Sequence, residues 1–225
     1  MSVLQEIIPE VEFPWLHQVG TVNEEHCKAF AQLALPAMLS ADRNFFHVCD
    51  SDPGLSQITD ELLEEVVGET GEFDGPVYAS NTGYNFPSGG YGKGDSNGYH
   101  SDGCNQVAIV STSGKGYLHL AWLPRYDAER NQLAHRNASS LNNIVEVIKN
   151  REIIGFVKPV EVVECVPGTL VRINQPQDYV VDGAGNKWDL VHGLYNAQGQ
   201  RISLMFRSYG PLGCDDGTSL RRPVF

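Results

Sequence analysis

The apolar positions in the first seventy residues follow a helical period. A stripe with a spacing of three or four residues is formed by Cys27, Phe30, Leu33 and Ala34. A second helix is expected to open at Thr59 and to end before Gly68, because acidic residues lead into an apolar run that a glycine closes. We therefore expect a helical region over about residues 1–70.

From Val77 onward the pattern changes to short apolar runs separated by glycine and asparagine, which is typical of strands and loops. The clearest strand candidates are 107–111, 116–122, 160–164, 168–173 and 201–209. Many short strands after a helical region favour a sandwich or jelly roll with helices packed outside it. We expect a mainly β fold with flanking helices (α+β), in a single domain over 1–225 with its β core at about 77–210.

One stretch interrupts the strand pattern. Residues 128–149 are largely polar, and their apolar positions at i, i+3, i+4 and i+7 are Leu141, Ile144, Val145 and Ile148. This spacing predicts an inserted helix at about 128–149.

Composition limits the class of protein. With 225 residues, 41% of them hydrophobic, the chain can bury one sizeable core. Its net charge of −12 repels a phosphate backbone, so we expect neither nucleic acid nor a membrane as a partner. The N-terminus lacks the features of a signal peptide, which predicts a cytoplasmic location. The five cysteines have no CxxC spacing, which argues against a disulfide framework and against structural zinc.

Two histidines and a carboxylate are candidate metal ligands. In a strand the side chains at i and i+2 share a face, so His100 and Asp102 can reach one ion. A lone His-x-Asp is more often structural, but His192 lies in a β-prone stretch downstream. Two imidazoles and one carboxylate form the ligand set of non-haem Fe(II) oxygenases, which leaves metal positions open for a cosubstrate and dioxygen.

A candidate carboxylate clamp follows the distal histidine. Arg201 comes nine positions after His192, and its guanidinium offers the planar fork that binds a carboxylate such as the distal one of 2-oxoglutarate. Ser203 lies on the same face of a strand and adds a hydroxyl donor. Arg207 also shares that face and either binds cosubstrate or an acidic substrate, or forms a structural ion pair. We expect His192 and Arg201 on adjacent antiparallel strands.

In this order of motifs the chain resembles the Fe(II)/2-oxoglutarate-dependent dioxygenases, on the branch shared with isopenicillin N synthase and the plant flavonoid oxygenases. The resemblance spans about 84–207. It includes 85–87, similar to the family's Asn-Tyr-Tyr-Pro segment, and 166–174, similar to its Pro-Gly-x-Leu-Val-Val-Asn strand. It implies a double-stranded β-helix, a distorted, cupin-like jelly roll. It also implies that Fe(II) is held by His100, Asp102 and His192, and the cosubstrate by Arg201 and Ser203.

The resemblance further implies that 2-oxoglutarate and O2 are consumed, succinate and CO2 are released, and ascorbate stimulates turnover. Radical halogenases of this superfamily lack the carboxylate, so Asp102 predicts hydroxylation, desaturation or cyclisation. Negative charge and compact length favour a small-molecule substrate, amino-acid-derived or a specialised metabolite. The alternatives are a peptidyl or protein hydroxylase, a 2-oxoglutarate-independent iron oxidase and a non-catalytic metal-binding jelly-roll protein. Oligomeric state is left open.

The chain departs from the family pattern at three points. Phe86 stands where a tyrosine commonly touches 2-oxoglutarate, so that hydroxyl is either replaced by a group of Tyr84 or Asn85, or missing. Asp102 and His192 are separated by 90 positions, longer than is usual on that branch. Gly193 replaces an arginine of the plant enzymes.

Two further features are open to both a structural and a functional interpretation. The glycine-rich segment 84–99 is either a lid over the iron or a surface connection. His119 and Trp122 are expected to be a buried, hydrogen-bonded histidine and a core indole rather than substrate contacts.

Overall fold

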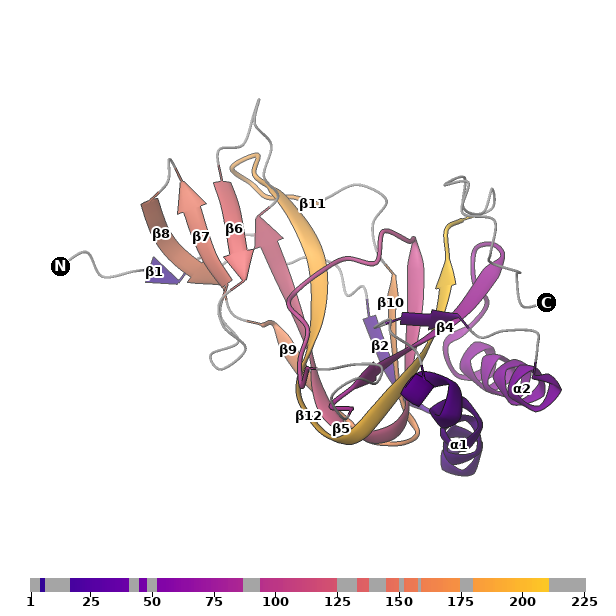
Figure 1. The fold of residues 1–225 in the computed structure, drawn as a ribbon. Coiled ribbons are helices and arrows are strands. Elements are labelled where there is room, and N and C mark those ends of the chain that lie inside the picture. Colours follow the sequence, from indigo (N-terminus) through magenta and orange to yellow (C-terminus); the bar gives the residue numbers. More distant parts are fainter. Residues whose placement is uncertain are drawn as a thin grey trace.

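The structure is a computed structural model that describes residues 5–6, 17–40, 45–47, 52–86, 94–124, 133–137, 145–149, 152–157, 159–174 and 180–210. These residues are mainly β, with two helices (Figure 1). The elements in chain order are β1 (Gln5–Glu6), β2 (His17–Thr21), α1 (Glu24–Ser40), β3 (Phe45–His47), α2 (Pro53–Thr70), β4 (Val77–Tyr84), β5 (Gln106–Pro124), β6 (Leu133–Asn137), β7 (Val145–Lys149), β8 (Glu152–Val157), β9 (Glu161–Cys165), β10 (Thr169–Asn174), β11 (Val180–Val181) and β12 (Lys187–Ser208).

The main sheet is built around two long antiparallel strands, β5 and β12, of 19 and 22 residues. Its strand order is β2-β10-β5-β12-β4-β3, and β9 and β11 pair with β5 and β12 respectively. The segments predicted as strands at 107–111 and 116–122 are both parts of β5, and 201–208 is the C-terminal part of β12. The mainly β prediction is therefore confirmed, and two of the expected short strands are joined in one long strand.

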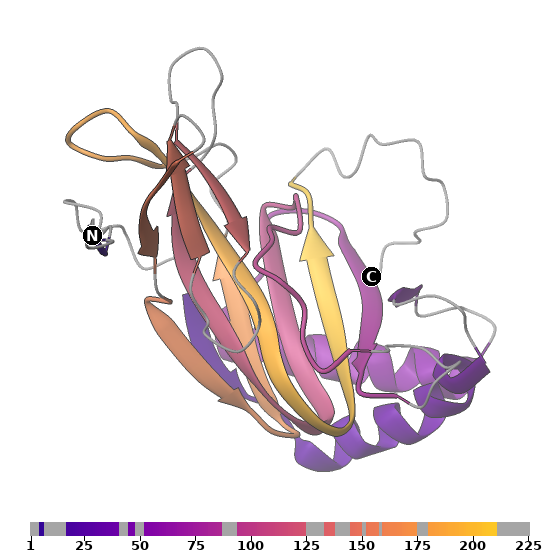
Figure 2. The ribbon, with the colours of Figure 1, turned by 60° about the vertical axis from the view of Figure 1, so that its left-hand side comes forward.

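Both long strands bend in the middle. The pairing shifts register between Tyr195 and Ser203, where Gly114, Asn196 and Gly199 adopt φ values of +65°, +53° and +66°. The first half of β12 thus pairs with the second half of β5, and the second half of β12 with the first half of β5. Figure 2 shows the two arms of this pair diverging from the bend, an arrangement compatible with a β-sandwich whose strands pass from one sheet to the other.

Successive side chains in the C-terminal half of β12 point alternately to the two faces of the sheet. Ile202, Leu204 and Phe206 pack in one apolar cluster with residues of α1 and α2, including Phe30 and Leu62. The intervening side chains turn to the opposite face, and these are Arg201, Ser203, Met205 and Arg207. The helices therefore cover one face of the sheet, and the polar candidates lie on the other.

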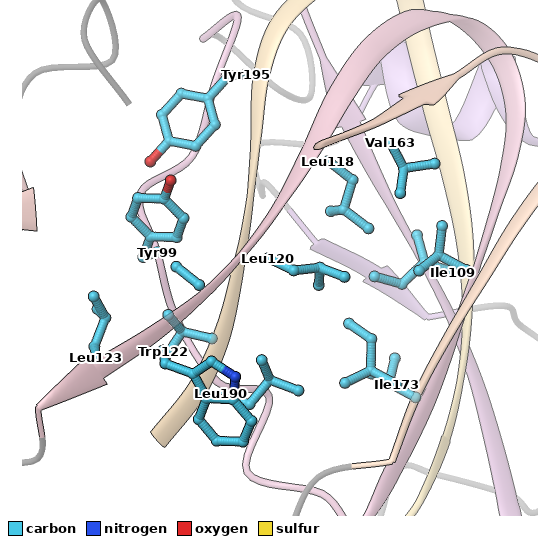
Figure 3. Close-up of a cluster of buried hydrophobic side chains, with 14 of the residues drawn as sticks. Tyr99, Ile109, Leu118, Leu120, Trp122, Leu123, Val163, Ile173, Leu190 and Tyr195 are labelled. Atoms are coloured by element: carbon cyan, nitrogen blue, oxygen red, sulfur yellow. The ribbon is translucent and has the colours of Figure 1, made fainter. Parts of the chain in front are cut away.

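A second apolar cluster joins both halves of the bent strands (Figure 3). It contains Ile109 from the first half of β5, Leu120 and Trp122 from the second half, and Ile173 from β10. Trp122 is buried, which confirms its interpretation as a core indole.

Helix α1 follows the predicted stripe, since Cys27, Phe30 and Ala34 are buried, whereas Leu33 is exposed. Helix α2 begins at Pro53, earlier than predicted. The reason is that the Asp52 side chain accepts hydrogen bonds from the backbone N–H groups of residues 54 and 55, which makes it the N-cap.

The helical region predicted at 1–70 also supplies strands. β2 pairs with β10, and β3 pairs with β4. Neither described helix has the combination of length and apolar character that a membrane span requires.

The helix predicted at 128–149 is wrong. Residues 133–137 and 145–149 form the antiparallel strands β6 and β7, in a separate sheet of order β1-β8-β7-β6. Leu141 and Ile144 of the predicted stripe lie outside the described residues. In the remainder, Val145, Val147 and Ile148 are β-branched and favour a strand, and β7 is hydrogen-bonded on both sides.

Candidate metal centre

The three predicted ligands lie together. One ligand atom each from His100, Asp102 and His192 falls within 4.8 Å of the others. His192 belongs to β12, whereas His100 lies outside the long strands and forms an isolated antiparallel bridge to His192, with both backbone N–H···O distances at 2.9 Å. This bridge places the His-x-Asp segment against the distal histidine.

Gly193 makes this close approach possible. A Cβ at this position would lie 3.1 Å from a ring carbon of Tyr195, and 3.2 Å from the backbone of Asn97 and of Gly98. A larger side chain would push the segment that carries His100 away from β12. The structure therefore has no room for a long side chain such as arginine at this position.

Each histidine offers a ring nitrogen to the centre. His100 Nδ1 donates to the Gly98 carbonyl at 2.8 Å, so Nε2 is the ring nitrogen left to face the centre. Burial lowers the pKa of His192 to about 4, although Asp102 opposes this shift. His192 is therefore neutral at physiological pH, as a metal ligand must be.

Asp102 is held by one oxygen and free at the other. Burial raises its pKa, but Arg207 and His192 outweigh burial and bring the pKa below its ordinary value. Arg207 donates to Oδ1 at 2.9 Å. The buried Oδ2 lies 3.4 Å from His192 Nε2 and has no hydrogen-bond partner among the described residues. Arg207 thus forms the ion pair that was one of its two predicted roles.

These residues fit a divalent metal. Ligand bonds of about 2.0–2.2 Å require donor atoms within roughly 4 Å of each other. His192 Nε2 lies 3.4 Å from Asp102 Oδ2 and His100 Nε2 lies 4.0 Å from Asp102 Oδ1, so each histidine is within this range of one carboxylate oxygen. Two imidazoles and a carboxylate are donors that suit Fe(II) with open positions, and the buried Asp102 Oδ2, which has no hydrogen-bond partner among the described residues, can serve as the carboxylate donor.

Arg201 lies deep beside this centre, with 1% of its surface exposed. Its guanidinium donates to Ser203 Oγ at 2.5 Å and to Ser111 Oγ at 3.0 Å. Burial lowers the pKa of Arg201, yet an arginine in a protein remains protonated. No acidic side chain pairs with it within the described part of the chain.

Two glycines of β5 provide the space for Arg201. A Cβ on Gly114 would lie 2.8 Å from Arg201 Cα, and a Cβ on Gly116 would lie 3.2 Å from its Nε. The glycines at the bend of β5 therefore leave space for the Arg201 side chain.

A cavity of about 270 Å³ connects the two groups. It is lined by all three candidate metal ligands together with Arg201, Ser203 and Tyr84. We predicted His192 and Arg201 on adjacent antiparallel strands. This prediction is wrong, because both residues belong to β12. The irregular pairing at 196–200 bends that strand, and residues of both halves line the cavity.

Tyr84, Asn85 and Phe86 lie in three different surroundings. Tyr84 lines the cavity, opposite Arg201 in the β4–β12 pairing. Asn85 does not: it is exposed, and its side chain donates to the Gly199 carbonyl at 3.2 Å. Phe86 is buried in the apolar cluster beneath the helices. Of the two predicted replacements for that hydroxyl, only Tyr84 lines the cavity.

Two residues at the site were not predicted from the sequence. Ser111 pairs with Ser203 across β5 and β12, and strand alternation could have indicated it. Asn97 lines the cavity, and no motif indicates it. His119 is buried, with Nδ1 3.4 Å from the Tyr99 hydroxyl, which confirms its interpretation as a buried histidine.

The described part of the predicted lid is attached to β12. Asn97 N–H donates to the Leu194 carbonyl at 2.8 Å, and Ala197 N–H donates to the Asp95 carbonyl at 2.7 Å. Of residues 94–99, Asn97 lines the cavity. Residues 87–93 of the predicted lid lie outside the described residues.

The fold and the site together define a β-rich protein with a candidate His–Asp–His metal centre. A scan against models of known protein families finds no match to this chain, and a search of curated proteins finds none either.

Proposed function

We propose that this protein is an Fe(II)- and 2-oxoglutarate-dependent oxygenase that oxidises a small molecule, and that its bent sheet is a double-stranded β-helix. The His–Asp–His centre supports the metal, and the adjacent clamp supports the cosubstrate. The proposal rests on their position in one cavity.

One observation carries the cosubstrate assignment. Arg201 is a buried cation whose described hydrogen-bond partners are neutral, in a cavity shared with a metal centre. A buried charge is strongly unfavourable unless an opposite charge accompanies it. A dicarboxylate that reaches from Arg201 to the metal would supply that charge and occupy open metal positions.

Each residue then has a defined task. Arg201 and Ser203 bind the distal carboxylate, and Arg207 holds Asp102 so that one oxygen faces the metal. Bound Fe(II) would supply the activation of dioxygen, coupled to conversion of 2-oxoglutarate to succinate and CO2. The apolar walls that include Leu118 and Leu194 exclude water from the site.

The size of the cavity favours a small substrate. Pockets for small molecules and cofactors have volumes of roughly 300–1,000 Å³, and this one, at about 270 Å³, is near the lower limit. The His100 side chain is 40% exposed, so the opening lies on its side of the metal. A substrate would approach from that side while the cosubstrate occupies the end at Arg201.

The test is anaerobic reconstitution with Fe(II), followed by addition of 2-oxoglutarate. We expect a metal-to-ligand charge-transfer band and, after oxygen and candidate substrates are added, succinate release. Iron binding without the band would reject the 2-oxoglutarate assignment and favour an iron oxidase that takes its electrons from the substrate. A band without succinate release under any substrate would favour a binding protein.

A further inference from the structure

We propose that Asn97 is a positioning residue for the cosubstrate: it orients the Tyr84 hydroxyl as a donor to the anion at Arg201. This inference rests on the proposed function for the identity of that anion. It assigns a role to a residue that carries no sequence motif.

Asn97 links three separate parts of the site. Its side-chain oxygen accepts the Leu194 N–H at 2.5 Å, on the half of β12 that carries His192. Its side-chain nitrogen donates to the Tyr84 hydroxyl at 3.0 Å, on β4. The carboxamide therefore spans from the metal half of the cavity to its anion half.

The direction of the second hydrogen bond determines what Tyr84 can do. A phenol has one donor and two acceptor positions, and the Asn97 amide can only donate from its nitrogen. Tyr84 must accept there, so its own proton goes to a second partner, either the Thr82 side chain, which also hydrogen-bonds this hydroxyl, or an anion in the cavity that both residues line. Burial raises the pKa of Tyr84, although Arg201 opposes this, so the phenol remains protonated near neutral pH.

Tyr84 is placed to use that proton on an anion. It is the cross-strand partner of Arg201, and the guanidinium carbon lies 5.7 Å from the centre of its ring. Both residues line the same cavity. An anion held by Arg201 would thus meet a phenol donor whose orientation Asn97 sets.

The contact also ties the anion pocket to the metal ligands. Asn97 lies three residues before His100, and its backbone N–H is bonded to the Leu194 carbonyl at 2.8 Å. The pocket around Arg201 is therefore complete only when the segment that carries His100 is seated on β12.

The test is a double-mutant cycle on cosubstrate affinity, read from the charge-transfer band during titration of the anaerobic Fe(II) protein with 2-oxoglutarate. We expect Asn97→Ala and Tyr84→Phe each to raise the Kd about five- to tenfold, the effect of one lost hydrogen bond. Because the two changes remove one interaction, the double variant should be no weaker than the weaker single variant. Fully additive effects on log Kd, or an unchanged Kd in Asn97→Ala, would overturn the proposal.

Asn97→Asp separates orientation from support of the fold. It keeps the acceptor for Leu194 N–H but removes the amide donor and adds a negative charge, so it should weaken 2-oxoglutarate more than Asn97→Ala does. An Asn97→Asp variant as tight as wild type would contradict the assigned role, and this variant also serves if Asn97→Ala does not fold. Asn105→Ala, whose side chain contacts Asp74 outside the cavity, is the matched control and should leave the Kd unchanged.

A second arm distinguishes failure of this inference from failure of the proposed function. Glutarate, a five-carbon dicarboxylate without the metal-chelating keto group, is added to the metal-free protein, and binding is read as a rise in melting temperature. If the band never forms but glutarate stabilises wild type more than Asn97→Ala, the anion pocket stands and the oxygenase assignment falls. If glutarate and 2-oxoglutarate both fail to bind wild type, the positioning role falls as well.

Discussion

Arg201 and Arg207 show how the partners of a side chain decide its role. They are six positions apart on one face of β12, and both are buried. Arg207 is neutralised by Asp102 and also donates to Ser80, at 2.5 Å. Arg201 meets only neutral donors and acceptors among the described residues. Arg207 therefore has a structural role beside Asp102, and Arg201 is available to an external anion.

Single substitutions should separate metal binding from 2-oxoglutarate binding. Arg201→Ala should weaken 2-oxoglutarate binding at least tenfold, because a charge-assisted pair contributes about 1.5–3 kcal/mol, and should spare iron. His192→Ala should lose the metal, since it removes one of three ligands. Iron content after anaerobic dialysis, together with the 2-oxoglutarate titration, measures both. Equal loss of iron in the two variants would contradict the assignment.

At the element scale, the close contact of the 97–100 segment with β12 places His100. The contact depends on hydrogen bonds to Leu194 and His192, and on the absence of a side chain at Gly193. The wrong prediction of a helix at 128–149 also concerns a whole element. Its apolar spacing satisfied a helical period, but β-branched residues and two neighbouring strands favoured β7.

Gly193→Ala should displace the segment that carries His100. We expect iron affinity to fall about tenfold, the lower end of the range for groups that orient metal ligands, with a smaller effect on overall stability. Gly68→Ala is the control: its Cβ would meet nothing within 4 Å, on an exposed part of α2, and iron affinity should not change. Wild-type iron affinity in Gly193→Ala would show that the close approach is not needed.

The turn before β12 should show a pH-dependent stability. The Asp182 carboxylate accepts hydrogen bonds from Asn186 and Trp188, which bring its pKa below the ordinary value although burial opposes this. A carboxyl with a lowered folded-state pKa stabilises the fold above the unfolded pKa of about 3.9 and loses this effect as pH falls. Asp182→Asn should therefore cost about 1–3 kcal/mol at pH 7, and the difference from wild type should shrink below about pH 4. Urea unfolding at both pH values tests this, and a constant difference would disprove it.

At the scale of the whole molecule, the candidate metal joins chain segments that are far apart. His100 and Asp102 precede β5, whereas His192 lies on β12 after the second sheet. A ligand that binds only the folded arrangement stabilises it by mass action, by about 2.7 kcal/mol at a hundredfold excess over Kd.

Metal binding should therefore raise the melting temperature of the protein. We expect a shift of roughly 5–10 °C with Fe(II) under anaerobic conditions at that excess, and a further rise with 2-oxoglutarate. Differential scanning fluorimetry measures both, with His192→Ala as the control in which the metal shift disappears. A shift of the same size in His192→Ala would place the ion elsewhere.

The sequence alone was sufficient for features that depend on neighbouring residues. Alternation along 201–207 correctly separated the polar face from the apolar one, and helical spacing located α1. Residue type and order also selected His100, Asp102 and His192 as candidate ligands, although only the structure shows that His192 lies beside the other two. These are local properties, and any fold that keeps the strand and the helix preserves them.

Only the tertiary structure decided which distant groups meet. The bend of β12 brings His192 and Arg201 to one cavity from a single strand. Arg207 forms an ion pair with Asp102, so it is not available to bind a ligand. Asn97 reaches Tyr84 because Gly193 lets its segment approach β12. Such contacts depend on the path of the chain between remote positions, and the order of residues along one segment does not contain that path.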